Sequence, residues 1–311
     1  MPHSEGLVGT YRQFWEDPPD EVDGDALIWY HRTQNQIVVH LSGPKGAKFT
    51  RKGNPDEYFV WALFHGVKVT AGDEVVDGTA GSVFVVPPGD SEVELTEDGS
   101  VWIGFTSNAV DLLDRCPNKT EYEPAADNIA PITPLPEPFD GYRLRHYHVN
   151  DLPPGSPHCY VHRTAMSKFK WPLRHKPRDP EKLSPHDHDD FEQASIIIAG
   201  TMIHHLRRPW GRNSREWLPD DHFVVVSPAI AVSKPPDIHT TQAVTNGVPV
   251  GLIDFYSPVR WDFVTVDGMV TNQAEYPKPT EVPRSYGRHD FVYDEGDPRR
   301  KLEAAGKPAA E

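Results

Sequence analysis

The sequence is poor in cysteine, in long apolar runs and in positive charge. Only Cys116 and Cys159 occur in 311 residues, without the short spacing of a zinc site, which argues against a disulfide framework and favours a reducing cytoplasm. No apolar run approaches the length of a membrane span, and the first residues lack the pattern of a secretory signal. With 31 basic and 46 acidic residues the formal charge is −15, so we expect neither nucleic acid nor a membrane as a partner.

Helical periodicity is also scarce, and the segment 108–116, with Asn108 as its N-cap, is the best helix candidate. The chain does contain 32 prolines, 23 glycines and many short runs of β-branched and aromatic residues between them. Each run is close to strand length and is bounded by glycine, proline or aspartate. This pattern predicts an all-β protein.

Two stretches of the sequence carry the same landmarks in the same order. The segment WYHRT at 29–33 matches YVHRT at 160–164, and each is followed by an apolar strand that ends in a glycine, Gly66 or Gly200. The apolar runs 82–89 and 222–229 come next in their respective stretches. We therefore predict a duplicated β-domain.

The duplication defines the expected organisation of the chain. Residues 1–122 form the first β-domain, the proline-rich segment 123–150 is a linker, and residues 151–270 form the second β-domain. Residues 271–311 are expected to form an extended arm and then a charged, disordered tail.

Histidines of the second stretch have the spacing of metal ligands. His186 and His188 are separated by one residue, and side chains at i and i+2 leave a β-strand on the same face. His239 follows a proline turn and precedes a strand-like run, so an antiparallel neighbour would bring it beside this pair. Imidazole suits iron, manganese, nickel, copper and zinc, and the pattern predicts one such ion at these three residues.

These motifs resemble the cupin superfamily, whose first motif runs G-x5-H-x-H-x3–4-E-x6-G and whose second runs G-x5-P-x-G-x2-H-x3-N. The three histidines match the metal histidines of the family, but the opening glycine of the first motif is missing, and so are the later glycine and the asparagine of the second. The resemblance implies a bicupin, with two jelly-roll β-barrels in tandem and few short helices. It also implies one divalent metal ion per chain, held only in the second barrel. Iron is our first choice, with manganese, zinc or nickel as alternatives.

The fourth ligand of the family is a glutamate, and counting back from Gly200 places Gln193 at its position. Glu192 lies one residue earlier and would point to the other face of a regular strand. Either Gln193 occupies the position, as a weak amide ligand or beside a three-histidine site, or a β-bulge turns Glu192 inward. We favour Gln193 as the metal-site residue and keep Glu192 as a candidate catalytic residue.

The first barrel is expected to lack a metal. The same alignment puts Lys52, Asn54 and Phe59 at the positions of the first two histidines and of the fourth ligand, and it replaces the last histidine by Ser91 or Glu92. The resemblance therefore implies a structural role for this barrel.

Four more histidines are candidates for chemistry. His146 and His148 repeat the H-x-H form, but no acid or amide follows at the required distance, so we do not expect a metal there. His204 and His205 follow Gly200 on the next predicted strand, where one of the two should face the barrel interior. We expect that residue to act as a base or to bind substrate.

Three functions are compatible with these expectations. The first is a mononuclear non-haem iron dioxygenase acting on a small oxygen-chelating substrate, a hydroxylated aromatic or a keto or hydroxy acid, because three histidines leave open metal positions. The second is a sugar-acid isomerase, epimerase or lyase that uses the metal as a Lewis acid. The third is a bicupin that binds a small molecule without turnover. In each case we expect a homodimer, the commonest oligomer.

Overall fold

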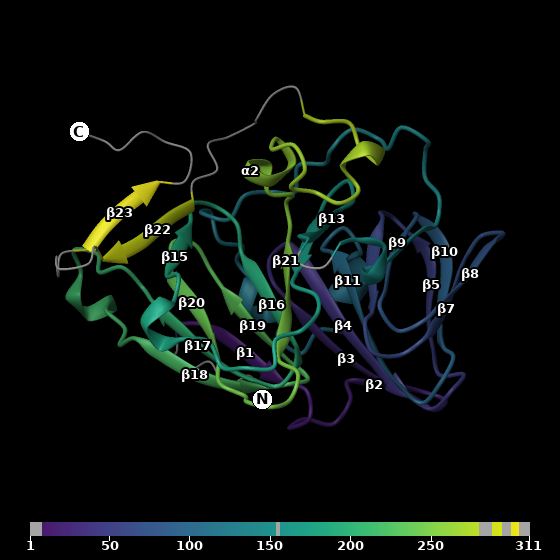
Figure 1. Ribbon diagram of the computed structural model, residues 1–311, viewed down its shortest axis with the longest axis horizontal. Coiled ribbons are helices and arrows are strands. Elements are labelled where there is room, and N and C mark those ends of the chain that lie inside the picture. Colours follow the sequence, from purple (N-terminus) through teal and green to yellow (C-terminus); the bar gives the residue numbers. More distant parts are fainter. Residues whose placement is uncertain (1–7, 154–155, 280–287, 294–299, 305–311) are drawn as a thin grey trace.

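The computed structural model describes residues 8–153, 156–279, 288–293 and 300–304, and its strands form four antiparallel β-sheets (Figure 1). Helices are short, as expected. Among the described residues, none of them has both the length and the apolar character needed to cross a membrane. The helical segments are α1 (Val110–Leu113), α2 (Trp261–Val264), η1 (Lys119–Tyr122), η2 (Val149–Asp151), η3 (Pro180–Lys182), η4 (Ser214–Glu216) and η5 (Gln273–Glu275).

The first two sheets have the orders β12-β9-β6-β11-β4-β3-β2 and β5-β10-β7-β8. Their strands are β2 (Glu21–Asp23), β3 (Ala26–Arg32), β4 (Gln36–Gly43), β5 (Lys48–Asn54), β6 (Tyr58–Ala62), β7 (Val67–Ala71), β8 (Glu74–Gly78), β9 (Ser82–Val86), β10 (Gly89–Leu95), β11 (Gly99–Thr106) and β12 (Arg145–His148).

The other two sheets have the orders β1-β19-β16-β21-β14-β13 and β18-β17-β20-β15-β22-β23. Their strands are β1 (Thr10–Gln13), β13 (His158–Val161), β14 (Met166–Phe169), β15 (His186–His188), β16 (Gln193–Ala199), β17 (Thr201–Arg207), β18 (Asp221–Val226), β19 (Ala229–Ser233), β20 (Ile238–Ala243), β21 (Gly251–Tyr256), β22 (Arg288–Tyr293) and β23 (Arg300–Ala304).

The strand orders confirm the predicted duplication. The order β12-β9-β6-β11-β4-β3 repeats as β1-β19-β16-β21-β14-β13, and the order β5-β10-β7-β8 repeats as β15-β20-β17-β18. One sequence landmark was wrong. The run 82–89 begins with β9, whose counterpart is β19, whereas the run 222–229 lies mainly on β18, the counterpart of β8.

The two barrels exchange their first strands. β1 comes from the start of the chain but pairs with β19 of the second barrel, and Figure 1 shows it among the strands of that half. β12, which lies in the segment expected to be a linker, pairs with β9 of the first barrel. In the C-terminal segment, residues 288–293 and 300–304 form β22 and β23, which extend the sheet beyond β15, and the end of the predicted disordered tail lies outside the described residues.

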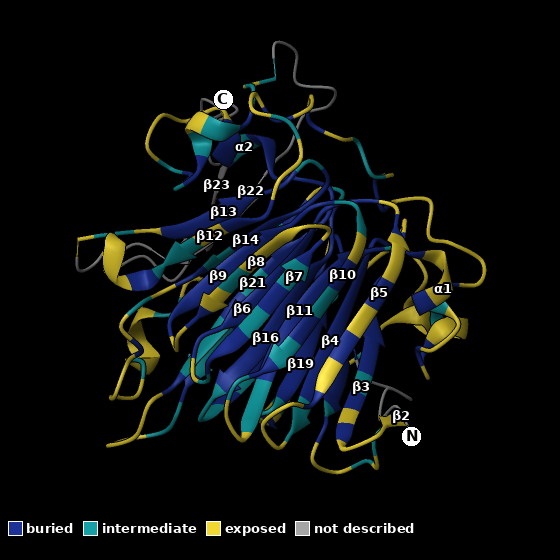
Figure 2. Cartoon of the chain, turned by 90° about the vertical axis from the view of Figure 1, so that its right-hand side faces the viewer, coloured by how far each residue is buried: buried dark blue, intermediate teal, exposed yellow. Residues whose placement is uncertain are grey.

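The strands between the barrels are buried on both faces, and Figure 2 shows β6, β11 and β16 as almost wholly buried. One face of each strand fills its own barrel and the other packs against the opposite barrel, so the sequence shows apolar runs instead of alternation. Trp61 packs edge-on against Phe255 with ring centroids 5.3 Å apart. Gly104 permits this packing, because a Cβ there would lie 2.3 Å from the Trp61 ring.

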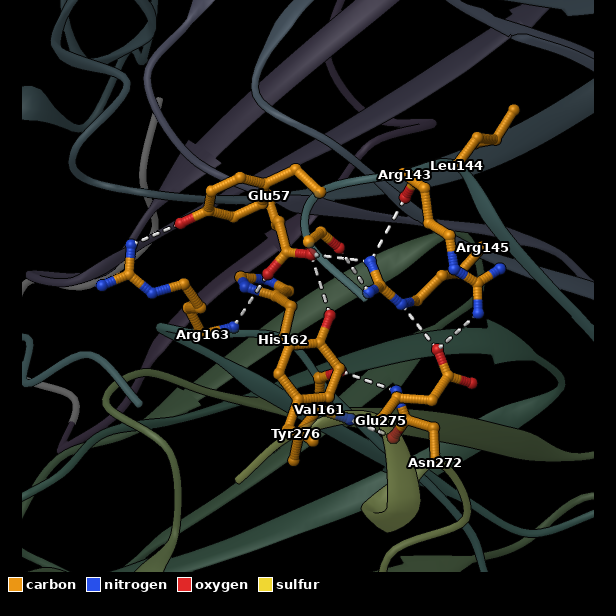
Figure 3. A network of polar contacts seen from close by, with 12 residues as sticks. Glu57, Arg143, Leu144, Arg145, Val161, His162, Arg163, Asn272, Glu275 and Tyr276 are labelled. Carbon is orange, nitrogen blue, oxygen red and sulfur yellow. Dashed lines mark hydrogen bonds and ion pairs between the residues drawn. The ribbon is translucent and has the colours of Figure 1, made fainter. Parts of the chain in front are cut away.

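Two buried glutamates join the barrels through the repeated HRT segments. Glu57 of the first barrel accepts a hydrogen bond from the backbone N–H of Arg163 (3.2 Å), and Glu192 of the second accepts one from the backbone N–H of Gln34 (2.7 Å). Figure 3 shows that Glu57 also accepts hydrogen bonds from the Arg145 guanidinium and from the Tyr276 hydroxyl. Burial raises the pKa of both carboxyl groups, and these partners offset part of that effect.

A second repeated motif, N-x-x-E-Y, supports the same junction and was missed in the sequence. Asn118 and Tyr122 belong to its first copy, and Asn272 and Tyr276 to its second. The Asn118 side chain bonds both backbone groups of Arg32, and the Asn272 side chain does the same with the strand that precedes the second HRT segment. The signal was present as an exact sequence match at equivalent places in the two halves.

Replacing Glu57 by alanine should destabilise the protein strongly. The change leaves the Arg145 guanidinium, which is 1% exposed, without one of its two carboxylate partners, and breaking a buried pair typically costs about 3–5 kcal/mol. Chemical denaturation measures this loss in the free energy of unfolding. Lys52→Ala, which removes an exposed ion pair with Asp90, is the control and should unfold like the parent. Equal stability of Glu57→Ala and the parent would contradict this account.

Candidate metal centre

The three predicted histidines come together inside the second barrel. His186 on β15 is the cross-strand partner of His239 on β20, and His188 follows on the same strand face. Their ring centroids are 4.4–5.2 Å apart, and one nitrogen of each lies within 4.8 Å of the others. His188 and His239 are buried and His186 is half-buried, so the cluster can be reached from one side.

Two of these imidazoles have a fixed tautomer. His186 Nδ1 lies 2.9 Å from the carbonyl oxygen of Ser184, and His239 Nδ1 lies 3.0 Å from that of Asp237. A carbonyl oxygen only accepts, so each Nδ1 carries the proton and each Nε2 carries the lone pair. Metal-binding histidines are held in this way in proteins, and the residues present therefore fit a divalent ion.

The turn before His239 is held by an ion pair. The Asp237 carboxylate is fully buried and receives two hydrogen bonds from Arg208, at 2.9 and 2.8 Å. Burial raises the pKa of Asp237, and the Arg208 guanidinium offsets part of this. Arg208 thus fixes the residue whose carbonyl orients His239.

Gln193 faces the interior of the second barrel, as predicted, but its amide is already held by neighbours. Its Nε2 donates to Asp254 (2.8 Å) and Ser195 (3.1 Å), and its Oε1 accepts from the Tyr256 hydroxyl (3.0 Å). The Tyr256 ring lies 6.3 Å from that of His188, edge to face. The role of Gln193 as a metal ligand stays a prediction. In the structure, Gln193 is connected to the histidines by Tyr256, which bonds Gln193 and packs against His188.

Glu192 points away from this interior, which corrects its assignment as a catalytic base. β16 begins at Gln193 and pairs with β19 in unbroken register from there to Ile197. Its carboxylate meets Gln34 at the junction of the barrels and is 1% exposed. The alternation of a regular β-strand explains the outcome.

His204 and His205 lie on opposite faces of β17. His204 is buried in the barrel interior beside Tyr11, burial lowers its pKa to about 3, and its Nε2 has no hydrogen-bond partner among the described residues. His205 is directed outward, where its ring contacts His222 and Gln242. His204 is therefore the one of the two that faces the interior, whereas His205, the other candidate for catalysis, lies outside the barrel interior.

The first barrel has an arginine, a serine and a tyrosine at the positions of the cluster and of Gln193. The strand pairing also corrects the sequence alignment by one residue. Arg51 is the cross-strand partner of Ser91, as His186 is of His239, so Arg51 and not Lys52 stands at that position. Arg51 binds Asp111 through two hydrogen bonds. The residue equivalent to Gln193 is Tyr58, and not Phe59 as the alignment predicted, and its hydroxyl is hydrogen-bonded to Ser91.

The histidines of the other H-x-H pair make contacts within the first barrel's sheet and its flanking turn. His146 stacks on Phe84 and bonds Ser82, and His148 contacts the carbonyl oxygen of Ala80 and caps η2. The two rings serve the packing of β12 on the first barrel.

Sequence reasoning missed two buried residues of the second barrel. Arg260 is 2% exposed, contacts the rings of Phe191 and Tyr256, and pairs with Asp262. An arginine inside the apolar run 255–264 was the available signal. Tyr11 arrives on the exchanged strand β1, and no local pattern indicated that pairing.

The sheets, their order and their duplication define a double cupin fold, in agreement with solved structures of that fold. Oxalate decarboxylase from Lactobacillus farciminis, in a formate complex, is 14% identical, with a TM-score of 0.53 over 80% of this chain and 86% of that chain. A deletion mutant of Bacillus subtilis oxalate decarboxylase is 13% identical, with a TM-score of 0.52 over 80% of this chain and 76% of that chain. Neither a family model nor a curated protein matches the chain.

Replacing Arg208 by alanine should weaken divalent-metal binding at the three histidines. Loss of a residue that orients a ligand typically costs about 10–100-fold in metal affinity. Competition with a chromophoric chelator measures the change, and Arg215→Ala, on the exposed turn η4 of the same loop, is the matched control. Equal affinities of the two variants would contradict the positioning role.

Proposed function

We propose that the protein is a metal-dependent double-cupin enzyme of the lyase type that acts on a small carboxylic acid. The observation that carries the proposal is the group His186, His188 and His239, which gathers three imidazole nitrogens within 4.8 Å in a barrel interior. The similarity in fold to oxalate decarboxylases supports the choice of a lyase and of a short dicarboxylic or 2-oxo acid as substrate.

The chemistry of the ligand set fits an anionic substrate. A divalent ion bound by neutral imidazoles keeps its full charge and supplies Lewis-acid polarisation of a substrate oxygen. In the lyase reaction the carbon–carbon bond beside a carboxylate breaks, carbon dioxide leaves, and the remaining carbon takes a proton. The protein must therefore orient the acid and supply that proton within a water-poor interior.

Residues of the barrel interior can perform these tasks. Tyr256, Gln193, Ser195 and Asp254 form one hydrogen-bonded chain, so each side chain has a single orientation towards the interior. His204 offers an imidazole nitrogen on the opposite wall. We assign the first group to the orientation of substrate and His204 to a hydrogen bond with it.

One observation favours the dioxygenase as a second candidate. The amide of Gln193 stands at the position of the glutamate in the family motif, and none of the three clustered residues is a carboxylate. A site without a carboxylate ligand leaves room for a bidentate anionic substrate and for oxygen. The substrate would then be an ortho-hydroxylated aromatic or a keto acid.

The experiment combines two readouts on protein loaded separately with iron(II), manganese(II) or zinc(II). Short dicarboxylic acids, 2-oxo acids and ortho-hydroxylated aromatic acids are supplied, while carbon dioxide release and oxygen consumption are followed together. We expect release of carbon dioxide without stoichiometric oxygen uptake, and loss of that activity of at least about a hundredfold in His239→Ala. His146→Ala, which alters a histidine of the first barrel's sheet, is the control.

Two outcomes would overturn the lyase proposal. Oxygen uptake in a one-to-one ratio with an aromatic or keto acid would establish the dioxygenase. Metal binding without turnover of any acid would leave a small-molecule-binding protein.

A further inference from the structure

A second pair of histidines lies on the outer face of the metal-bearing barrel. His205 on β17 and His222 on β18 are direct cross-strand partners, with ring centroids 5.0 Å apart and ring planes at 64°. Their Nδ1 atoms are 2.9 Å apart. His222 is exposed and His205 is half-buried, so the two nitrogens meet at the protein surface.

A neighbouring amide determines where the proton of His205 lies. Its Nε2 is 3.1 Å from Oε1 of Gln242, an oxygen that only accepts, so Nε2 carries the proton and Nδ1 carries the lone pair. His222 then donates its own Nδ1 proton to His205. Because His222 is exposed, its proton can move from Nδ1 to Nε2, which turns a second lone pair towards the same point without a change in net charge.

We propose that His205 and His222 form a binding site for a divalent transition-metal ion, with copper(II) bound most tightly and nickel(II) next. Metal–imidazole bonds of about 2.0–2.1 Å place two nitrogens about 2.9 Å apart when the angle at the metal is roughly 90°. The observed spacing matches that angle, which is the preference of tetragonal copper(II) and nickel(II), whereas tetrahedral zinc requires nitrogens farther apart. Water completes the coordination on the exposed side.

The surroundings of the pair suit a cation. Asp220, whose carboxylate is paired with Arg207, precedes strand β18 two residues before His222. Thr240, the cross-strand partner of His205 on the other side, is 8% exposed, and its hydroxyl has no hydrogen-bond partner among the described residues. Gln242 holds the His205 ring in place, the role that outer partners of metal-binding histidines commonly have.

The site is separate from the interior cluster and does not depend on the proposed function. Neighbouring residues of a strand point to opposite faces, so His204 faces the interior and His205 faces solvent. A sheet therefore stands between the outer pair and the three clustered histidines.

Equilibrium dialysis of the full chain against copper(II), with electron paramagnetic resonance of the bound ion, tests the proposal. The parent should bind two ions per chain, and His222→Gln should bind one and lose the signal of the outer site. Gln242→Leu should bind at the outer site about 10–100-fold more weakly than the parent. His175→Gln, which alters another exposed histidine, is the matched control and should bind like the parent.

Either of two results would overturn the outer site. Equal binding by His222→Gln and the parent would exclude it, and equal losses in His222→Gln and His175→Gln would show adventitious surface binding only. The His188→Ala variant distinguishes the two sites, because it should lose the ion of the interior cluster and keep the ion of the outer pair. A chain that binds a single copper ion, lost in His222→Gln and kept in His188→Ala, would support the outer site while contradicting the proposed function.

Discussion

Each barrel buries one glutamate against the backbone of a loop in the other barrel, and the arrangement of the two barrels depends on this reciprocal pair of hydrogen bonds. Glu57 receives the N–H of Arg163, and Glu192 receives the N–H of Gln34. Both carboxylates are at most 1% exposed, so each depends on the hydrogen bond from the other barrel to offset part of the cost of its burial. Because Glu192 directly precedes Gln193, the same contact sets the start of the strand that enters the interior of the second barrel.

The duplicated scaffold concentrates its candidate chemistry in one copy. Where the second barrel sets His186 opposite His239, the first sets Arg51 opposite Ser91. A guanidinium that already binds Asp111 excludes a metal ion by charge and by volume. The first barrel therefore contributes stability and position: it accepts β12 and supports the second barrel through the buried aromatic interface, while the start of the chain supplies β1 to the second barrel.

Features with local periodicity could be predicted, and features set by distant pairing could not. The two-residue period of a strand was enough to place His186 and His188 on one face and to favour Gln193 over Glu192 as the residue that faces the interior. The sequence could not show that β1 pairs with the second barrel, because no local pattern identifies which strand a given strand will pair with. The same limit applies to Glu192, since alternation predicted its face but the loop that it binds is 158 residues away. The alignment of the first barrel slipped by one residue because it relied on a single glycine landmark.

The metal content of the protein, measured by elemental mass spectrometry after purification without metal-affinity steps, tests the central claim most directly. Three proteins are compared: the parent, His188→Ala and His146→Ala. The account predicts about one ion per chain in the parent and in His146→Ala, and its loss in His188→Ala. The same metal content in all three proteins, or no metal in the parent even after reconstitution, would contradict it.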